Sequence, residues 1–253
     1  MRMFKHTPTY IPFNPKSRTL SHSMMVYNKP SYDSVVQDWA DSYLSDPNHL
    51  LICGSTGCGK SVTENTLLYY SFLRGDSKYI FIDIKKVELF QYKNIAPCRY
   101  YANDNLGVNE ALTIALDIMD SRYARMMQEG IKTYKGENLF IVIDEVADLL
   151  QGENKKNFYS KLLKIAQLGR AAKVFLIVCT QNSKRDLLKD IKNNFGTVIG
   201  LHTLDATASR NLIGSSGCEL LTIGRGLMLT NTIRNITINK VDDRLIRELL
   251  TTL

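Results

Sequence analysis

The most informative stretch of this sequence is a glycine-rich octapeptide, Gly54-Ser55-Thr56-Gly57-Cys58-Gly59-Lys60-Ser61. It follows the apolar run Leu50-Leu51-Ile52-Cys53, which has the length of a strand, and precedes residues 62–73, whose pattern predicts a helix. A Gly-x4-Gly-Lys-Ser string between a strand and a helix is the pattern of a loop that binds nucleotide phosphates. A glycine-rich turn without a nucleotide is the alternative, and the combination of spacing and context disfavours it.

The chemistry of such a loop gives its residues separate roles. Glycines allow the backbone to curl so that successive N–H groups point inward at a polyphosphate, and the following helix N-terminus adds partial positive charge. Lys60 is predicted to reach the β- and γ-phosphates, and the Ser61 hydroxyl to ligate Mg²⁺. The expected cofactors are therefore ATP and Mg²⁺. The predicted nucleotide-binding residues are Gly54, Ser55, Thr56, Gly57, Cys58, Gly59, Lys60, Ser61 and Val62.

A second segment points to hydrolysis. Leu139-Phe140-Ile141-Val142-Ile143 is an uninterrupted apolar run, as expected for a strand buried on both faces of a parallel sheet, and Asp144-Glu145 follows it. An acidic residue at such a strand end can hold the water shell of Mg²⁺, and a second carboxylate beside it can act as general base on a water. We predict these roles for Asp144 and Glu145 respectively. The alternative is an Asp at a helix N-cap followed by a Glu in the first turn.

Length and composition set broader limits. The 253 residues, 44% hydrophobic and 23% charged, suit one large α/β domain. The net charge of +7 is a weak indication of an anionic partner. The longest uncharged apolar stretch, Val174–Thr180, is far shorter than a membrane span, and no secretory signal is recognisable, so we expect a soluble cytoplasmic protein.

The five cysteines do not form a disulfide framework or a zinc-ligand pattern. Cys53 and Cys179 lie in apolar runs and are predicted to be core residues. For Cys58, inside the glycine-rich loop, we expect the nearby backbone N–H groups and Lys60 to lower the pKa of the thiol.

Strands and helices alternate along the chain, which predicts a mostly parallel β-sheet with crossover helices on both faces. A hairpin around Asn231-Thr232 and a final helix capped by Asp242 are expected near the C-terminus. Residues 1–30 read as an extended arm, and residues 31–253 as one domain that begins with an amphipathic helix over 35–44. The predicted strands are His49–Cys53, Tyr79–Ile84, Leu139–Ile143, Lys173–Cys179, Thr197–Leu201, Gly226–Thr230 and Ile233–Ile238. The other predicted helices are Lys60–Leu73, Leu106–Gln128, Phe158–Leu168, Lys184–Lys192 and the last one, from Asp242 to Leu253.

Residues around these motifs resemble the FtsK/SpoIIIE family of DNA-pumping motors. The resemblance covers about residues 48–238 and is carried by segments in the order of the family, with some departures: Ile84 stands where the family usually has Pro, Asn182-Ser183 where it has Arg-Pro, and Leu227 where it has Asp. The membrane-spanning N-terminal region and C-terminal winged-helix module of the family are not recognisable, which favours a plasmid, phage or integrative element as the source. The segments are Asn48–Val62, Phe81–Leu89, Ile143–Leu149, Arg170-Ala171-Ala172, Ile177–Gln181, Asp205–Ile213 and Gly224–Leu229.

The resemblance implies a RecA-like P-loop NTPase that assembles as a hexameric ring around double-stranded DNA, with ATP between subunits. Arg170 then becomes a candidate finger that reaches into the site of a neighbouring subunit, the alternative being a surface Arg at a helix end. Gln181 is a candidate for sensing the γ-phosphate or orienting the attacking water, the alternative being a buried amide at a strand end. Arg210 is a weaker candidate for an interface cation. DNA contacts are expected mainly to phosphates, from loops that face the pore.

The resemblance favours an ATP-dependent translocase of double-stranded DNA. A coupling ATPase for conjugative transfer of single-stranded DNA and a protein-secretion ATPase are alternatives, because such proteins share this core. A scaffold that holds ATP without hydrolysis is a further alternative, which an intact Glu145 disfavours.

Overall fold

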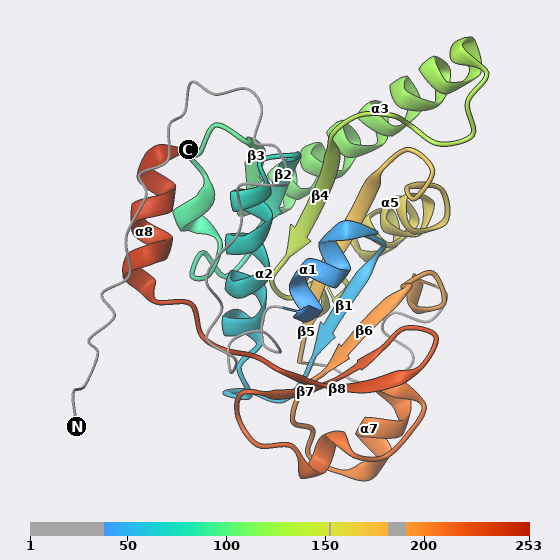
Figure 1. Ribbon diagram of the computed structural model, residues 1–253. Coiled ribbons are helices and arrows are strands. Elements are labelled where there is room, and N and C mark those ends of the chain that lie inside the picture. Colours follow the sequence, from blue (N-terminus) through green and yellow to red (C-terminus); the bar gives the residue numbers. More distant parts are fainter. Residues whose placement is uncertain (1–37, 152, 182–190) are drawn as a thin grey trace.

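The computed structural model describes residues 38–151, 153–181 and 191–253 (Figure 1). The predicted arm at residues 1–30 and most of the predicted helix Lys184–Lys192 lie outside these ranges. The strands are β1 (Leu50–Cys53), β2 (Ser77–Ile82), β3 (Cys98–Ala102), β4 (Asn138–Ile143), β5 (Val174–Thr180), β6 (Thr197–Gly200), β7 (Arg225–Leu229) and β8 (Ile233–Thr237). The helices are α1 (Asp38–Ser45), α2 (Lys60–Arg74), η2 (Phe90–Tyr92), α3 (Asn105–Glu129), α4 (Val146–Leu149), α5 (Lys155–Leu168), α7 (Ala206–Ile213), η3 (Cys218–Leu220) and α8 (Asp243–Thr252).

All eight described strands join one sheet, in the order β3-β2-β4-β5-β1-β6-β7-β8. The first six in this order are parallel, and the β7–β8 hairpin adds two antiparallel strands at one edge. The predicted α/β fold with a mostly parallel sheet and a C-terminal hairpin and helix is confirmed. The sheet order could not be read from the sequence, and it makes β4, β5 and β1 direct neighbours.

This order decides where the sequence motifs meet. Cys53, the last residue of β1, pairs with Thr180, the last residue of β5, and Ile143 at the end of β4 pairs with Val178. Because parallel strands end at the same edge of a sheet, the segments that follow β1, β4 and β5 emerge side by side. Both segments with predicted catalytic chemistry therefore lie at one edge, the carboxyl edge.

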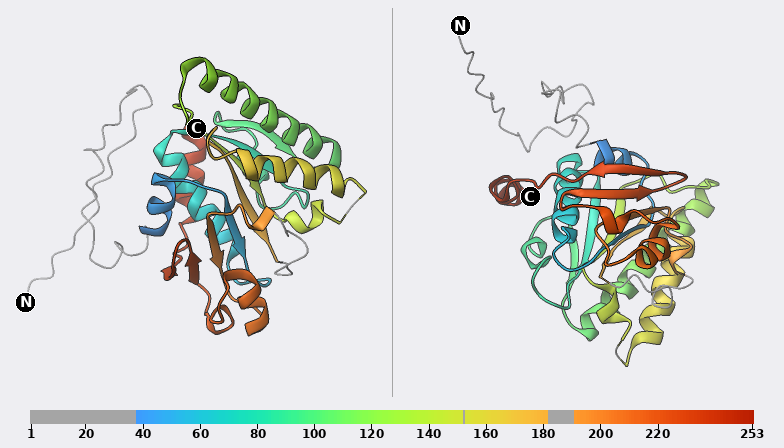
Figure 2. Two further views of the ribbon diagram at one scale, coloured as in Figure 1. Left: turned by 90° about the vertical axis from the view of Figure 1, so that its right-hand side faces the viewer. Right: turned by 90° about the horizontal axis from the view of Figure 1, so that it is seen from below.

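Each face of the sheet is covered by its own layer of helices (Figure 2, left). Side chains alternate along the strands: in β4, Leu139, Ile141 and Ile143 pack in the layer of α3, α4 and α5, whereas Phe140 and Val142 pack in that of α1, α2 and α8. The central strands are apolar at nearly every position because both of their faces are buried.

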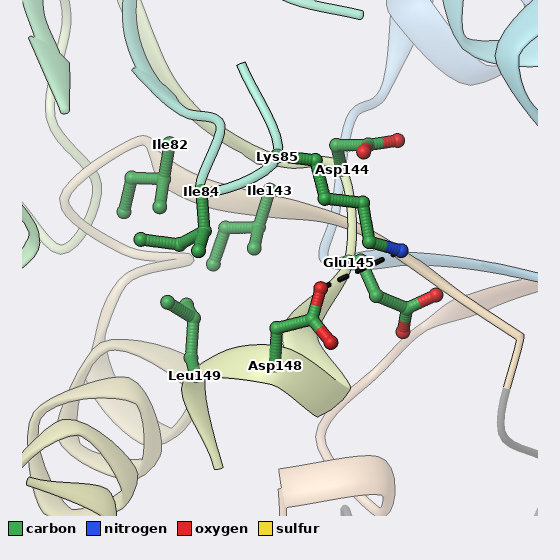
Figure 3. Close-up of a pocket in the computed structure, with 8 residues that line it drawn as sticks. All are labelled: Ile82, Ile84, Lys85, Ile143, Asp144, Glu145, Asp148 and Leu149. Atoms are coloured by element: carbon green, nitrogen blue, oxygen red, sulfur yellow. Dashed lines mark ion pairs between the residues drawn. The ribbon is translucent and has the colours of Figure 1, made fainter. Parts of the chain in front are cut away.

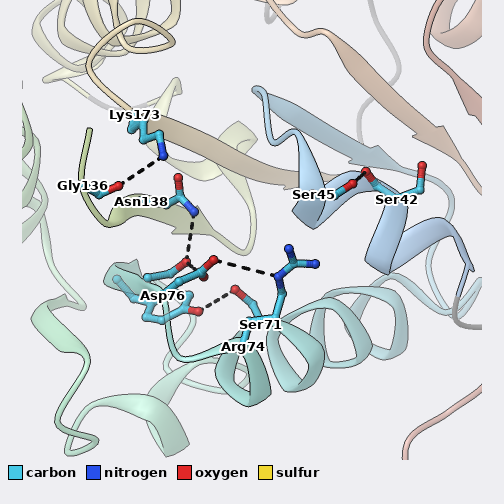
Figure 4. A network of polar contacts seen from close by, with 10 residues as sticks. Ser42, Ser45, Ser71, Arg74, Asp76, Gly136, Asn138 and Lys173 are labelled. Atoms are coloured by element: carbon cyan, nitrogen blue, oxygen red, sulfur yellow. Dashed lines mark hydrogen bonds and ion pairs between the residues drawn. The ribbon is translucent and has the colours of Figure 1, made fainter. Parts of the chain in front are cut away.

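The amino edge of the sheet is held by polar contacts between β2, β4 and their flanking turns (Figure 4). Ser77 Oγ donates to Asp76 Oδ1 at 2.8 Å and accepts from Asn138 Nδ2 at 3.5 Å, while Arg74 lies 4.0 Å from Asp76. These contacts tie the first residue of β2 to the first residue of β4. They fix the register of the two strands at the edge opposite the sequence motifs.

Most sequence predictions agree with the described elements within one to three residues. The helix capped by Asp242 is confirmed, since Asp242 Oδ1 accepts from Arg244 N at 2.8 Å. Five described elements were missed: the edge strand β3, the helices α4 and α7, and the short 3-10 helices η2 and η3. Of the predicted helix over 35–44, residues 35–37 lie outside the described ranges and the rest forms α1. No described helix is long and apolar enough to span a bilayer.

Candidate functional site

The glycine-rich loop connects β1 to α2, as the sequence predicted. Gly57 and Gly59 have φ angles of 76° and 101°, a region that non-glycine residues rarely adopt, and Gly59 is the N-cap of α2. At Gly54 the reason for glycine is space, since a Cβ atom there would lie 2.5 Å from Cys58 Sγ and 2.8 Å from Leu201 Cβ. The loop therefore depends on glycine for two different reasons, backbone conformation and close packing.

Lys60 lies back over this loop. Its Nζ donates to the carbonyl oxygens of Gly54 at 2.9 Å and Ser55 at 3.0 Å. An ammonium group has three N–H donors, so these bonds leave one for a phosphate oxygen. The loop is also braced from the segment after β6, because the backbone N and Oγ of Ser55 both donate to the carbonyl oxygen of His202, at 2.8 and 3.0 Å. Nothing in the sequence indicated this role for His202, which uses only its backbone.

Glu145 is held by three hydrogen bonds at the end of β4. Its Oε1 accepts from Thr180 Oγ1 at 2.7 Å and from Ala147 N at 3.3 Å, and its Oε2 accepts from Gln181 N at 3.0 Å. The side chain is only 8% exposed. Glu145 is also the N-cap of α4, so the N-cap alternative applies to Glu145 rather than to Asp144. The carboxylate of Glu145 caps α4 and is also the predicted general base, and the two roles are compatible.

Gln181 links the carboxylate to the phosphate loop. Its backbone N–H donates to Glu145, and its side-chain Oε1 accepts from Thr56 Oγ1 at 2.7 Å. The residue is exposed, so the alternative of a buried amide at a strand end is wrong. The position suits the predicted γ-phosphate sensor, because the amide lies between the loop and the predicted base.

Asp144 lies next to Glu145 in an acidic environment. The pKa of its carboxyl group is raised to about 6, first by burial and then by the negative charges of Glu88 and Asp83, against the opposing effect of Lys85. A divalent cation offsets such clustered negative charge. No three acidic, histidine or cysteine side chains within the described ranges converge closely enough to hold a metal ion alone. Mg²⁺ usually takes one or two protein ligands together with phosphates and waters, and Ser61 and Asp144 are the residues predicted to hold it.

A small hollow adjoins the two carboxylates (Figure 3). It lies between the segments that follow β2 and β4, and an ion pair of 3.5 Å between Lys85 Nζ and Asp148 Oδ2 crosses it. Asp83 shapes this side of the site, because its carboxylate accepts from Val87 N at 3.3 Å and Leu89 N at 2.9 Å and so fixes the turn after β2. The residues that line the hollow are Ile82, Ile84, Lys85, Ile143, Asp144, Glu145, Asp148 and Leu149.

Sequence reasoning placed Asp83, Lys85 and Glu88 in a family-like segment and gave them no role. Their proximity to Asp144 depends on β2 and β4 being neighbours in the sheet, which no local pattern reveals. The prediction for Cys58 is wrong: burial of the thiol raises its pKa and outweighs the opposing effects of Lys60 and the backbone N–H groups. The prediction used only the positive charge near Cys58. The sequence did not show that Cys58 is buried, and burial is the larger effect on the pKa of its thiol.

Arg170 is not part of this cluster. It is exposed and lies before the first residue of β5, whereas Thr180 and Gln181 lie at the other end of that strand. A strand of seven residues spans about 20 Å, so Arg170 is at the opposite edge of the sheet from Glu145 of its own chain. The turn that carries it is firmly held, since Arg122 Nη1 donates to the carbonyl oxygens of Ala172 and Lys173, both at 2.9 Å.

A mostly parallel sheet with a phosphate loop after β1 and a carboxylate pair after β4, with β5 between these two strands, defines the class of P-loop NTPases. Comparison with known proteins agrees with this class. Residues 31–138 match the model of the FtsK/SpoIIIE family. The DNA translocase FtsK of Oceanobacillus iheyensis is 32% identical over 208 residues, and that of Borreliella burgdorferi is 35% identical over 201 residues. The chain belongs to the FtsK/SpoIIIE family.

Each of these two alignments covers 72% of this chain, but only 26% and 25% of the respective relative. The chain thus spans about a quarter of the length of the curated relatives it matches. Among solved structures, the pCW3 conjugation coupling protein TcpA is similar, with a TM-score of 0.73 and 20% identity over 83% of this chain and 66% of that one. EssC (ATPases 2 and 3) from Geobacillus thermodenitrificans has a TM-score of 0.68 and 21% identity over 81% of this chain and 42% of that one. At these identities the structural likeness establishes the fold alone.

Proposed function

We propose that this chain is the motor core of an ATP-driven DNA translocase. The observation that carries the proposal is the set of contacts that joins the phosphate loop to a fixed carboxylate, Thr56–Gln181 and Gln181–Glu145. A protein that only stores a nucleotide has no need for an oriented carboxylate beside its phosphates. DNA is the preferred cargo because curated relatives at 30–35% identity are named DNA translocases.

The residues divide the hydrolytic work. Lys60 and the backbone N–H groups of the loop bind the β- and γ-phosphates of ATP. Glu145 takes the proton from the attacking water, and the bonds from Thr180 and Gln181 keep its carboxylate aimed toward the loop. When bound, Mg²⁺ supplies charge neutralisation on the phosphate oxygens. Gln181 contacts both the loop and the base, so a γ-phosphate bound at the loop affects the position of Glu145 through Gln181.

The position of Arg170 supports a ring in which subunits complete each other's sites. An exposed arginine at the opposite end of β5, a strand about 20 Å long, from its own Glu145 acts in catalysis only from a neighbouring chain. Its turn is pre-organised by Arg122, which lowers the conformational cost of presenting the guanidinium to a partner. We propose a homo-oligomer, a hexamer by the family resemblance, with Arg170 as the finger.

We place this motor in the cytoplasm, where ATP and DNA are available, and the five cysteines are free thiols, as in a reducing compartment. Contact with duplex DNA is proposed to be mainly through phosphates, which suits movement over any sequence. Lys155 and Lys156, exposed at the start of α5, are described candidates, whereas Lys184, Arg185 and Lys189 lie outside the described residues.

Steady-state ATPase activity with double-stranded, single-stranded and no DNA tests the proposal. Stimulation by the duplex supports a translocase, and stimulation by the single strand alone supports a conjugative coupling ATPase instead. ATP hydrolysis that is indifferent to both contradicts a DNA motor and favours the secretion alternative. The Lys60→Ala variant serves as control, because it removes the lysine that binds the β/γ-phosphates and should abolish productive ATP binding.

A further inference from the structure

Glu64 is a buried carboxyl group to which the proposed chemistry gives no task. It lies in the second turn of α2 and is 0% exposed. Its Oε1 accepts a weak hydrogen bond from Cys179 Sγ at 3.5 Å. Its Oε2 is buried and has no hydrogen-bond partner within the described residues. An unpaired carboxyl oxygen in the interior destabilises the fold. A buried glutamate at this position therefore suggests a functional role.

The position of Glu64 points toward the phosphate loop. It follows Lys60 by four residues and Ser61 by three, and residues at these spacings lie on the same face of a helix. Its other contact, Cys179, directly precedes Thr180, which donates to Glu145. Glu64 is therefore buried between the first turns of α2 and the end of β5.

The charges around Glu64 indicate what it faces. Burial raises the pKa of its carboxyl group well above the usual range, and the charge of Asp144 is the next largest cause, followed by those of Glu88 and Asp83. Glu64 is therefore within electrostatic reach of Asp144, Glu88 and Asp83, and its Oε2 has no partner within the described residues. A bond from a thiol, which is a weak donor, does not account for this arrangement.

We propose that Glu64 is a further carboxyl group of the magnesium–nucleotide site and accepts, through Oε2, a hydrogen bond from a water of the bound cation. This rests on the proposed function, because it requires a metal–ATP complex at Ser61 and Asp144. Mg²⁺ usually keeps several waters, and partners that hold those waters tune the affinity of the metal. Glu64 is a positioning residue for the metal. Its unpaired oxygen destabilises the fold without the metal because that oxygen is placed to bond to a water of the bound cation.

The test is titration of Mn²⁺, used as the probe for Mg²⁺, into the full chain loaded with ATPγS, followed by electron paramagnetic resonance. Glu64→Gln keeps the shape and removes the ability to carry negative charge, and we expect it to weaken Mn²⁺ affinity by about tenfold or more. Glu64→Leu should weaken Mn²⁺ affinity similarly and raise the melting temperature by about 2–4 °C, since it removes an unpaired polar oxygen. Thr66→Val, which removes a buried hydroxyl on the same helix that bonds to Asn239 O, is the matched control and should leave Mn²⁺ affinity unchanged.

Nucleotide affinity in EDTA should be the same for wild type and Glu64→Gln, because the loop itself is untouched. Mn²⁺ affinities equal to wild type in both Glu64 variants would overturn the proposal. Failure of both variants to fold would also overturn it, by showing that Glu64 supports the fold. The experiment measures metal binding and not hydrolysis. If wild type shows no DNA-stimulated turnover, the proposed function is contradicted, but the Mn²⁺ affinities can still be compared.

Discussion

His49 makes the stability of this protein depend on pH in a way that the structure specifies. It is 2% exposed and directly precedes β1, with its ring edge-on to Phe175 and Phe195. Its Nδ1 accepts from Leu176 N at 3.0 Å, so in the neutral ring the proton is on Nε2. A proton on Nδ1 would break this bond. Burial, followed by the positive charge of Arg170, lowers the pKa of His49 to about 4.

The sign and size follow from linkage. In the unfolded chain His49 has a pKa near 6.5, whereas in the folded chain its pKa is about 4. Between these two pH values the unfolded state binds a proton at His49 and the folded state does not. The contribution to stability is therefore complete above about pH 6.5 and is lost as the pH falls toward 4. A difference of about 2.5 pKa units at 1.36 kcal/mol each corresponds to about 3 kcal/mol.

Urea unfolding of wild type and His49→Asn from pH 7.5 to pH 4.5 measures this contribution. The single tryptophan, Trp39, is 2% exposed and serves as the fluorescence probe. The asparagine keeps an acceptor for Leu176 N and does not titrate. Carboxyl groups such as Asp144 are present in both proteins, so their contributions to the pH dependence of stability cancel in the difference. We expect wild type to lose about 2–3 kcal/mol more than the variant over this range. Parallel pH profiles would refute the reasoning.

Three further outcomes are expected at the catalytic edge. Glu145→Gln should bind ATP and hydrolyse it at least about tenfold more slowly, because an amide does not accept the proton from water; a smaller fall in single-turnover rate would exclude Glu145 as the base. Arg170→Ala should retain nucleotide binding and lose up to about a thousandfold in turnover. Mixing Arg170→Ala with Glu145→Gln should restore part of the DNA-dependent ATPase activity, since some interfaces then combine Arg170 of one chain with Glu145 of the next; no recovery in mixtures shown to co-assemble would contradict a finger that acts between chains.

Strong local patterns allowed much of the fold to be predicted. The apolar runs of β1, β4 and β5 are continuous because both faces of these strands are buried. The glycine spacing before Lys60, between a strand and a helix, is typical of a phosphate-binding loop. The strand β3 was missed because it is a half-exposed edge strand, and its side chains carry neither a buried run nor a clear alternation.

The candidate site was predictable only where the chemistry is contiguous in sequence. Asp144-Glu145 was found because the pair ends an apolar run, whereas the bonds of Glu145 to Thr180 and Gln181 depend on β4 and β5 being neighbours. Glu64 had no sequence signal at all, since a glutamate on an amphipathic helix is ordinarily at the surface. Its burial follows from the packing of α2 against the sheet.

Displacement of the third strand from a DNA triplex is the most direct test of the central claim, that ATP hydrolysis moves this chain along DNA. We expect wild type to release the labelled strand from a duplex track only when ATP is present. Lys60→Ala and Glu145→Gln should release none above background. Robust ATP hydrolysis stimulated by the duplex, with no release from tracks of any length, would contradict the account.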